Sequence, residues 1–254
     1  MAVDEQDPDA GLVRMSLVDH LRELRRRVVI CAIAVSVGAV AAFFLYNQVL
    51  HFLRQPYCEA LAHRHLENEG PGCNLVITDP LEGFTTRLKV SGYLGLFLAS
   101  PIVLWQLWRF ITPGLHKREK KYAVPFIMSS IVLFALGGLV AILTFPKALD
   151  FLISVSGKGI STFFTPSKYI NLYVLVIAAF GLAFEFPIVL VFLELAGVLP
   201  SKRLSQWRRP AIVVIFVAAA IITPSQDPYS LFAMAIPMCI FYELSILIGK
   251  ILKK

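Results

Sequence analysis

The chain has 254 residues, of which 57% are apolar and only 16% charged, and Lys and Arg outnumber Asp and Glu by 24 to 17. A soluble domain usually carries about 25% charged and under 50% apolar residues, so the composition disfavours a water-soluble protein. The mean hydropathy of +0.71 excludes a disordered chain. A positive net charge can indicate nucleic-acid binding, but here the basic residues stand between long apolar runs, which is typical of a polytopic membrane protein.

Six apolar runs are candidates for membrane-spanning helices, each of which needs about 20 mostly apolar residues. They cover residues 28–50, 84–108, 122–145, 169–197, 211–223 and 229–249. The sequence therefore predicts an all-α protein with six transmembrane helices. We assign residues 16–254 to one membrane domain and residues 1–15 to a disordered acidic leader.

The placement of the basic residues predicts the orientation. Seventeen of the 24 Lys and Arg residues precede the first run, follow the second and fourth runs, or end the chain. Five lie in the alternate loops, and two lie inside the second run. Because cytoplasmic loops carry the excess of Lys and Arg, we expect both termini to be cytoplasmic.

Two carboxylates stand in strongly basic segments on that side. Glu23 lies in the segment His-Leu-Arg-Glu-Leu-Arg-Arg-Arg at residues 20–27, and Glu119 lies in His-Lys-Arg-Glu-Lys-Lys at residues 116–121. A carboxylate can accept a bidentate fork from a guanidinium, so the pair could receive two arginines if the fold brings them together. The charge pattern alone favours a simpler interpretation, in which Glu23 pairs with Arg27 four residues later.

The first outside loop holds two of the four cysteines, Cys58 and Cys73, in a stretch rich in Pro and Gly. The outer side of a bacterial membrane is oxidising, so we predict a Cys58–Cys73 disulfide. His63 and His65 lie in the same loop without carboxylate or thiolate neighbours, and we predict no metal site. The sequence contains no Walker, HExxH or GxSxG motif, so we expect neither a cofactor nor an enzyme activity.

The second run begins with the polar residues Thr85, Thr86, Arg87 and Lys89. Two interpretations remain open for this end of the helix. It either lines a wet concave surface or simply begins outside the membrane.

The fourth run contains the clearest intramembrane charge, Glu185, followed by Pro187. Ionisable groups inside a membrane are usually functional, and Pro187 predicts a kink near a cavity. The alternative is a protonated Glu185 bonded to a neighbouring helix. Glu194 and Glu243 stand near the cytoplasmic ends of their runs, where we expect them to be solvated at the membrane interface and to have no special function.

The fifth run, residues 211–223, has 13 residues and would be about 20 Å long, short of a hydrocarbon core of about 30 Å. Either the membrane is locally thinned beside it, or the helix begins earlier and its arginines snorkel to the surface.

Four motifs in order resemble the TatC family, the multispanning subunit of the twin-arginine protein translocase. They are His-Leu-Arg-Glu-Leu-Arg at 20–25, the segment from Pro101 to Lys120, Phe-Glu-Phe-Pro at 184–187, and Ile-Pro-Met at 236–238 with Tyr-Glu at 242–243. The resemblance covers nearly all of the chain from about Ser16. It implies a glove-like bundle whose concave face is lined by Glu185.

The resemblance also implies the site residues. Glu23 and Glu119 match the family's carboxylates that bind the signal peptide, with Arg25, Leu115 and Lys117 as neighbours. Pro56 matches a Pro of the outside loop and Lys89 a polar residue of the second span, and we place Asp227, in the loop before the last span, with Pro56, Lys89 and Glu185 among the contacts of the concave face and the partner proteins. The family commonly has Pro at position 226 and Gln at position 231, whereas this chain has Gln226 and Leu231.

The resemblance predicts a receptor for twin-arginine signal peptides in the bacterial cytoplasmic membrane. It implies assembly with single-span TatA-like and TatB-like proteins and with further copies of the chain, and export of folded proteins driven by the proton-motive force. It implies no nucleic-acid partner. The competing hypothesis is a proton-coupled secondary transporter that uses Glu185.

Overall fold

The computed structural model of the chain describes residues 17–62, 75–111, 123–155 and 164–251, and within these ranges it is built from helices without strands. The helices are α1 (Leu17–Phe44), α2 (Tyr46–Ala62), α3 (Glu82–Ile111), α4 (Ala123–Val155), α5 (Pro166–Ala183), α6 (Phe186–Leu195), α7 (Ser201–Gln206), α8 (Arg208–Ile222) and α9 (Pro228–Ile251). The predicted all-α fold is confirmed. The predicted leader at residues 1–15 lies outside the described residues.

Five helical stretches in the described ranges are long and apolar enough to cross a membrane, namely Val18–Phe44, Glu82–Ile111, Val124–Val155, Pro166–Leu195 and Pro228–Ile251. They correspond to five of the six predicted spans, with shifted ends. The remaining predicted span corresponds to α8, which has 15 residues. At 1.5 Å per residue α8 is about 22 Å long, so it is short, as the sequence predicts.

The first membrane helix lies earlier in the chain than the predicted span at residues 28–50. It begins at Leu17 and ends at Phe44, and α2 follows after a break at Leu45. The stretch with Pro56 and Cys58, which we assigned to an outside loop, is helical and belongs to α2. Packing explains the difference, because α2 buries Leu53, Pro56 and Tyr57 against the bundle although its composition is only weakly apolar.

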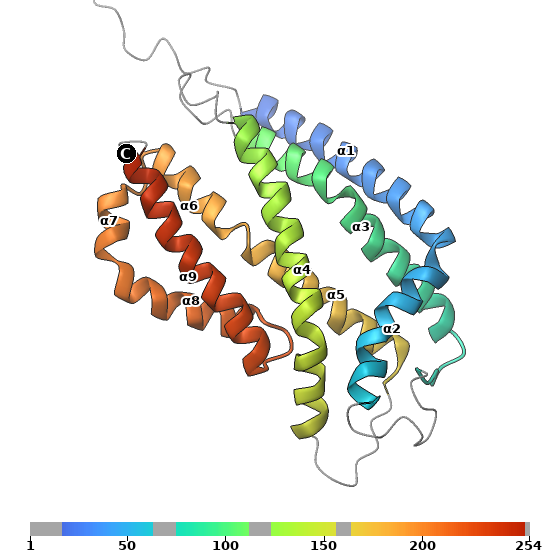
Figure 1. The fold of residues 1–254 in the computed structure, drawn as a ribbon. Helices are drawn as coiled ribbons and strands as arrows, with labels where there is room; N and C mark the ends of the chain where they lie inside the picture. The colour runs from blue at the N-terminus through green and yellow to red at the C-terminus, as the bar shows by residue number, and fades with distance from the viewer. Residues whose placement is uncertain (1–16, 63–74, 112–122, 156–163, 252–254) are drawn as a thin grey trace, which may run out of the picture.

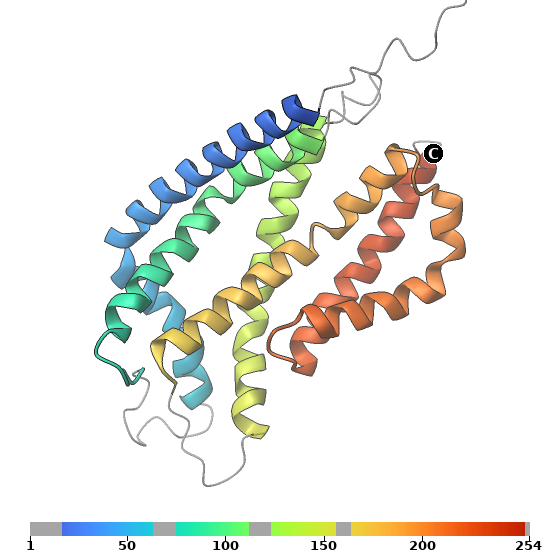
Figure 2. The same cartoon turned by 180° about the vertical axis from the view of Figure 1, so that it is seen from behind.

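The helices α1 and α3 lie side by side along their lengths (Figures 1 and 2). Gly38 and Gly95 make this approach possible. A Cβ atom on Gly95 would lie 2.5 Å from the backbone nitrogen of Ala39, and one on Gly38 would lie 2.9 Å from the carbonyl oxygen of Gly95. Small residues of this kind let membrane helices approach closely.

The core gathers around α4, which contacts α2, α3, α5, α6 and α9. Phe145 of α4 stacks on Tyr173 of α5 with ring centroids 4.2 Å apart. Tyr169 packs against Tyr57 of α2, and its hydroxyl donates to the carbonyl oxygen of Leu53 at 2.7 Å. These buried aromatic side chains fix the start of α5 against α2 and α4.

A break at Phe184 and Glu185 separates α5 from α6. The predicted kink is therefore confirmed. Pro187 has no N–H to donate to the carbonyl oxygen four residues earlier, so one hydrogen bond of the helix is lost at this point, which favours the break. The break places the Glu185 side chain in the interior, where 9% of the residue is exposed.

The segments α7, α8 and α9 form the other side of the molecule. In both views the turn between α8 and α9 stops short of the far end of α4 (Figures 1 and 2). The beginning of α1 and the end of α9 lie at the same end of the bundle (Figure 1). We call this the terminal end.

Candidate functional site

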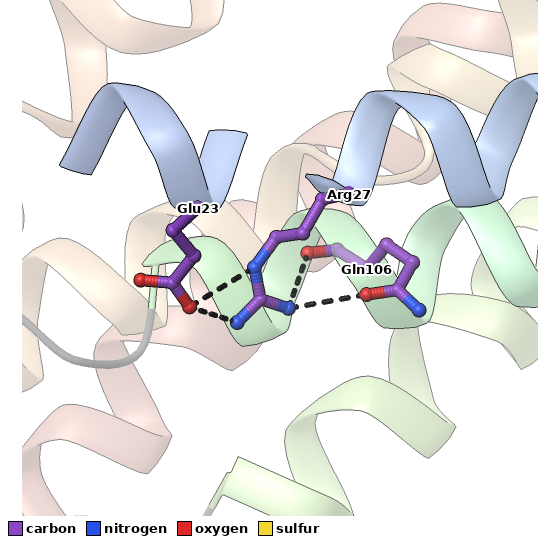
Figure 3. A network of polar contacts seen from close by, with 3 residues as sticks. All are labelled: Glu23, Arg27 and Gln106. Atoms are coloured by element: carbon purple, nitrogen blue, oxygen red, sulfur yellow. Dashed lines mark hydrogen bonds and ion pairs between the residues drawn. The ribbon is translucent and has the colours of Figure 1, made fainter. Parts of the chain in front are cut away.

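The carboxylate of Glu23 forms an ion pair with Arg27 on the same helix (Figure 3). The Arg27 Nε donates to Glu23 Oε1 at 3.2 Å, and Nη2 donates to the same oxygen. Nη1 of Arg27 donates to the side-chain oxygen of Gln106 on α3 at 3.1 Å and approaches the Gln106 carbonyl oxygen at 3.5 Å. The local pairing that the charge pattern favoured is thus present.

The geometry of this pair leaves Glu23 partly available. Both bonds from Arg27 end on Oε1, and no hydrogen bond within the described residues reaches Oε2. The Glu23 side chain is 25% exposed, whereas that of Arg27 is 12% exposed. An incoming guanidinium can therefore reach Glu23, but it must replace Arg27 to form a two-bond fork with both oxygens.

The beginning of α1 is held against the end of α3. The ring of His20 stacks on that of Phe110 with centroids 4.5 Å apart, and Arg27 bridges to Gln106. Arg25, a predicted neighbour of the site, is exposed. The other predicted residues, Leu115, Lys117 and Glu119, lie outside the described residues, in the segment that continues from the end of α3 at Ile111.

A chain of polar contacts connects three helices around Glu185. The indole Nε1 of Trp108 on α3 donates to Ser130 Oγ on α4 at 2.8 Å, and Ser130 Oγ donates to Glu185 Oε2 at 2.5 Å. Oε1 of Glu185 is buried without a hydrogen bond within the described residues. The sequence indicates Glu185 but not its partners, because Trp108 and Ser130 lie in other helices and no spacing relates them to Glu185.

Glu185 also lines a cavity of about 940 Å³ between the α5–α6 wall and α8. The rest of the cavity wall is mostly apolar and comes from α5, α6, α8 and α9, and α7 adds the polar side chains of Arg203 and Gln206. The predicted cavity near the kink is present.

Glu194, which we expected to be solvated, is instead 1% exposed. Its carboxylate lies against Gly249 of α9, where an added Cβ atom would be 2.5 Å from either oxygen. Neither oxygen has a hydrogen bond within the described residues. Glu243, the other carboxylate near a helix end, pairs with Arg208 at 2.9 Å at the surface.

The polar start of α3 serves two different contacts. Lys89 is exposed and its Nζ donates to Ser167 Oγ on α5 at 2.8 Å. Arg87 lies 4.2 Å over the ring of Phe43 and donates to the Phe43 carbonyl oxygen at 3.3 Å, which ties α3 to the end of α1. Nothing in the sequence around Arg87 indicates this role.

Two residues that we predicted to contact partner proteins, Pro56 and Asp227, are buried within the fold. Pro56 is buried inside α2. Asp227 is 1% exposed and begins α9, where Oδ1 accepts the backbone N–H of Ser230 at 2.8 Å and Oδ2 accepts Ser225 Oγ at 2.5 Å. This is the arrangement of a helix N-cap, which the Asp-Pro pair at the start of α9 could have indicated. Contacts of Pro56 and Asp227 with partner proteins stay predictions.

Of the cysteines, Cys31 and Cys239 are free, and Cys58 is disulfide-bonded. Cys73, the predicted partner of Cys58, lies outside the described residues, so their pairing stays a prediction.

Burial on α2 raises the pKa of the Tyr57 hydroxyl above its ordinary value.

The fold and these sites define a multi-pass α-helical membrane protein with a partly exposed acidic site at its terminal end and a buried carboxylate beside a cavity. Residues 19–237 match the model of the Sec-independent protein translocase protein TatC family. The chain belongs to the TatC family and is therefore a component of a Sec-independent protein translocase.

Similar proteins agree with this assignment. A TatC protein of Frankia casuarinae is 38% identical over 93% of this chain and 66% of its own length, and one of Koribacter versatilis is 40% identical over 93% of this chain and 85% of its own length. The chain thus spans slightly less than two thirds of the Frankia relative. A crystal structure described as the twin-arginine translocase receptor TatC is 37% identical, with a TM-score of 0.70 over 92% of this chain and all of that chain.

Proposed function

We propose that this protein is the receptor for twin-arginine signal peptides and the assembly core of its translocase. The observation that carries the proposal is the position of Glu23, which is partly exposed on α1 beside the end of α3. The segment that continues from that end contains Glu119, the second predicted carboxylate. In this proposal the two carboxylates together receive the paired arginines of the signal peptide.

Binding at Glu23 is an exchange of guanidinium groups. A signal arginine forms a fork with both oxygens of Glu23, and Arg27 withdraws to Gln106, to which it is already bonded. A lysine has a single ammonium group and cannot form such a fork. Replacement of both signal arginines by lysine is therefore expected to weaken binding by about tenfold.

We place the protein in the bacterial cytoplasmic membrane with both termini inside. The terminal end carries the basic residues around α1 and α7–α8, which agrees with an excess of Lys and Arg on the cytoplasmic side. TatA-like and TatB-like single-span proteins and further copies of this chain would join it in the membrane. The proton-motive force would supply the energy for export, since the sequence has no Walker motif.

Site-specific photocrosslinking tests the receptor directly. A photoreactive residue at position 23 or 119 should crosslink to a twin-arginine precursor and much less to its double-lysine form. A probe at Glu59, exposed on α2 away from the terminal end, serves as the matched control. Equal crosslinking of the two precursors from position 23 would contradict the carboxylate receptor.

Glu185 supports a competing function, because it is buried beside a cavity and one of its oxygens has no hydrogen bond within the described residues. A proton-coupled transporter would use such a group. Uptake of a small solute by vesicles that contain only this protein, lost in Glu185→Gln, would favour the transporter. Signal-peptide crosslinking without such uptake would favour the receptor.

A further inference from the structure

The last turns of α3 contact two neighbouring helices through polar side chains. On the α1 side, the side-chain oxygen of Gln106 accepts Nη1 of Arg27 at 3.1 Å (Figure 3). On the α4 side, the indole Nε1 of Trp108 donates to Ser130 Oγ at 2.8 Å. We call residues 102–111 the α3 end.

The packing around Trp108 makes its hydrogen bond sensitive to small movements. Trp108 is 4% exposed, and its ring centroid lies 5.3 Å from that of Phe126 on α4 and 5.8 Å from that of Phe192 on α6. A hydrogen bond to an indole nitrogen is lost when the two atoms are more than about 3.5 Å apart. A displacement of the α3 end by about 1 Å is therefore enough to break the contact with α4.

The two contacts of the α3 end belong to two different sites. Gln106 holds Arg27, the partner of Glu23. Trp108 begins the hydrogen-bonded chain that ends on Glu185. Two residues of a helix span only about 3 Å along its axis, so Gln106 and Trp108 move together.

A proline separates the α3 end from the rest of α3. Pro101 stands inside the helix and has no N–H for the carbonyl oxygen of Phe97, which accepts Ser100 Oγ at 2.7 Å instead. Before this point α3 is fixed against α1, because a Cβ atom on Gly95 would lie 2.5 Å from the backbone nitrogen of Ala39. Bending at Pro101 therefore moves the α3 end while the close contact of α1 and α3 stays intact.

Binding at Glu23 needs space between α1 and the α3 end. The side chains of Glu23 and Arg27 are only 25% and 12% exposed. In the exchange proposed above, the guanidinium of the signal peptide takes Glu23 while that of Arg27 stays at Gln106. Two cationic groups then lie where one lay, and they repel each other. The α3 end moves away from α1 to admit the second group.

We propose that the α3 end couples signal-peptide binding at Glu23 to the buried contacts of Glu185, with Trp108 as the positioning residue. The inference rests on the proposed function, because the ligand at Glu23 is an arginine of the signal peptide. An arriving peptide bends α3 at Pro101, which separates Trp108 from Ser130 and opens the chain. By linkage, a chain that is already open favours peptide binding.

The fluorescence of Trp108 measures this movement. The chain has three tryptophans, and the other two, Trp105 and Trp207, are 36% and 60% exposed. The full chain with Trp105→Phe and Trp207→Phe, in nanodiscs, reports Trp108 alone. A twin-arginine peptide without Trp should shift the emission to longer wavelength, because water gains access to the indole, with the midpoint found by anisotropy of the labelled peptide.

The two measurements separate the two proposals. Anisotropy that shows binding, with unchanged emission of Trp108, would overturn the coupling and leave the receptor in place. If the anisotropy showed no binding to the unaltered chain, both proposals would be overturned.

Trp108→Phe tests the coupling from the other site. The substitution keeps an aromatic ring but removes the N–H that Ser130 accepts. Because one hydrogen bond no longer has to be broken, the peptide should bind about fivefold more tightly. Trp105→Phe makes the same change at a more exposed position of the α3 end and should leave the affinity unchanged. Equal affinities of the two variants would overturn the coupling, since a purely structural Trp108 predicts no tighter binding.

Pro101→Ala tests the hinge. Alanine supplies the N–H that the Phe97 carbonyl oxygen lacks and stiffens α3, so the peptide should bind about threefold more weakly and shift the emission of Trp108 less. Pro146→Ala makes the same change inside α4, towards its far end, and should alter neither quantity. Equal effects of the two substitutions, or a full emission shift in Pro101→Ala, would overturn the hinge.

Discussion

Arg27 acts as an internal competitor for the arginines of the signal peptide if the proposed exchange at Glu23 is correct. It occupies Oε1 of Glu23 with two hydrogen bonds, and a fork to an incoming guanidinium needs both oxygens. Arg27→Gln removes the competitor. We therefore expect this substitution to strengthen signal-peptide binding, although Arg27 is itself a polar residue of the site.

The size of the effect follows from the environment of the pair. An exposed pair at i,i+4 is worth about 0.3–0.5 kcal/mol, and a hydrogen bond to a charged group about 1.5–3 kcal/mol. The Arg27 side chain is 12% exposed and that of Glu23 is 25% exposed, which places the pair between these limits. About 1 kcal/mol is a reasonable value, and it corresponds to about fivefold tighter binding.

Fluorescence anisotropy of a labelled twin-arginine peptide, with the protein in nanodiscs of fixed composition, measures the change. Arg27→Gln also lowers the general repulsion between the protein and a cationic peptide. Arg26→Gln makes the same charge change at an exposed neighbour and corrects for this effect. If Arg27→Gln bound the peptide no more tightly than Arg26→Gln, Arg27 would position Glu23 rather than compete for it.

Three further predictions concern stability, measured by thermal unfolding in detergent. Gly95→Val should destabilise the protein by several kcal/mol because α1 leaves no space for a Cβ atom at Gly95. Gly92→Val should be tolerated, because a Cβ atom at Gly92 would have no atom of a neighbouring helix within 4 Å. Ser130→Ala should lower the melting temperature more than Glu185→Gln, since only the former leaves a buried carboxylate without its donor, at about 1–3 kcal/mol. Asp227→Ala should cost about 1–2 kcal/mol by loss of the N-cap, and Asp227→Asn should retain most of that stability. The opposite order within any of these pairs would contradict the corresponding contact.

Hydropathy and charge predict the membrane helices well but not their ends. Whether a run of residues crosses the membrane depends on its apolar content, which can be read from the sequence. The helix α2 was missed because its residues are only partly apolar and include Pro56. Its position depends on the packing of Tyr57 against Tyr169, a residue more than a hundred positions away, and no local pattern contains that contact.

The contacts of the candidate sites can likewise be predicted from sequence where they are local, but not where they join separate helices. The pairing of Glu23 with Arg27 is local and follows from helical spacing. The contact of Ser130 with Glu185 joins two helices and follows only from the fold. Glu194 is the clearest failure, because its place near a helix end suggested solvent, whereas Gly249 lets α9 pack directly onto its carboxylate.

The two candidate carboxylates, Glu23 and Glu185, differ in their exposure and in their hydrogen-bond partners. Glu23 is partly exposed, and its partner Arg27 also donates to Gln106, so Arg27 keeps a hydrogen bond when that ion pair opens. Glu185 is buried, and its donor Ser130 is held in turn by Trp108, so opening that contact leaves several buried polar atoms unsatisfied. The exchange that we propose for the signal peptide therefore suits Glu23 better than Glu185. Glu185 suits a step that first requires α3, α4 and the α5–α6 break to move apart.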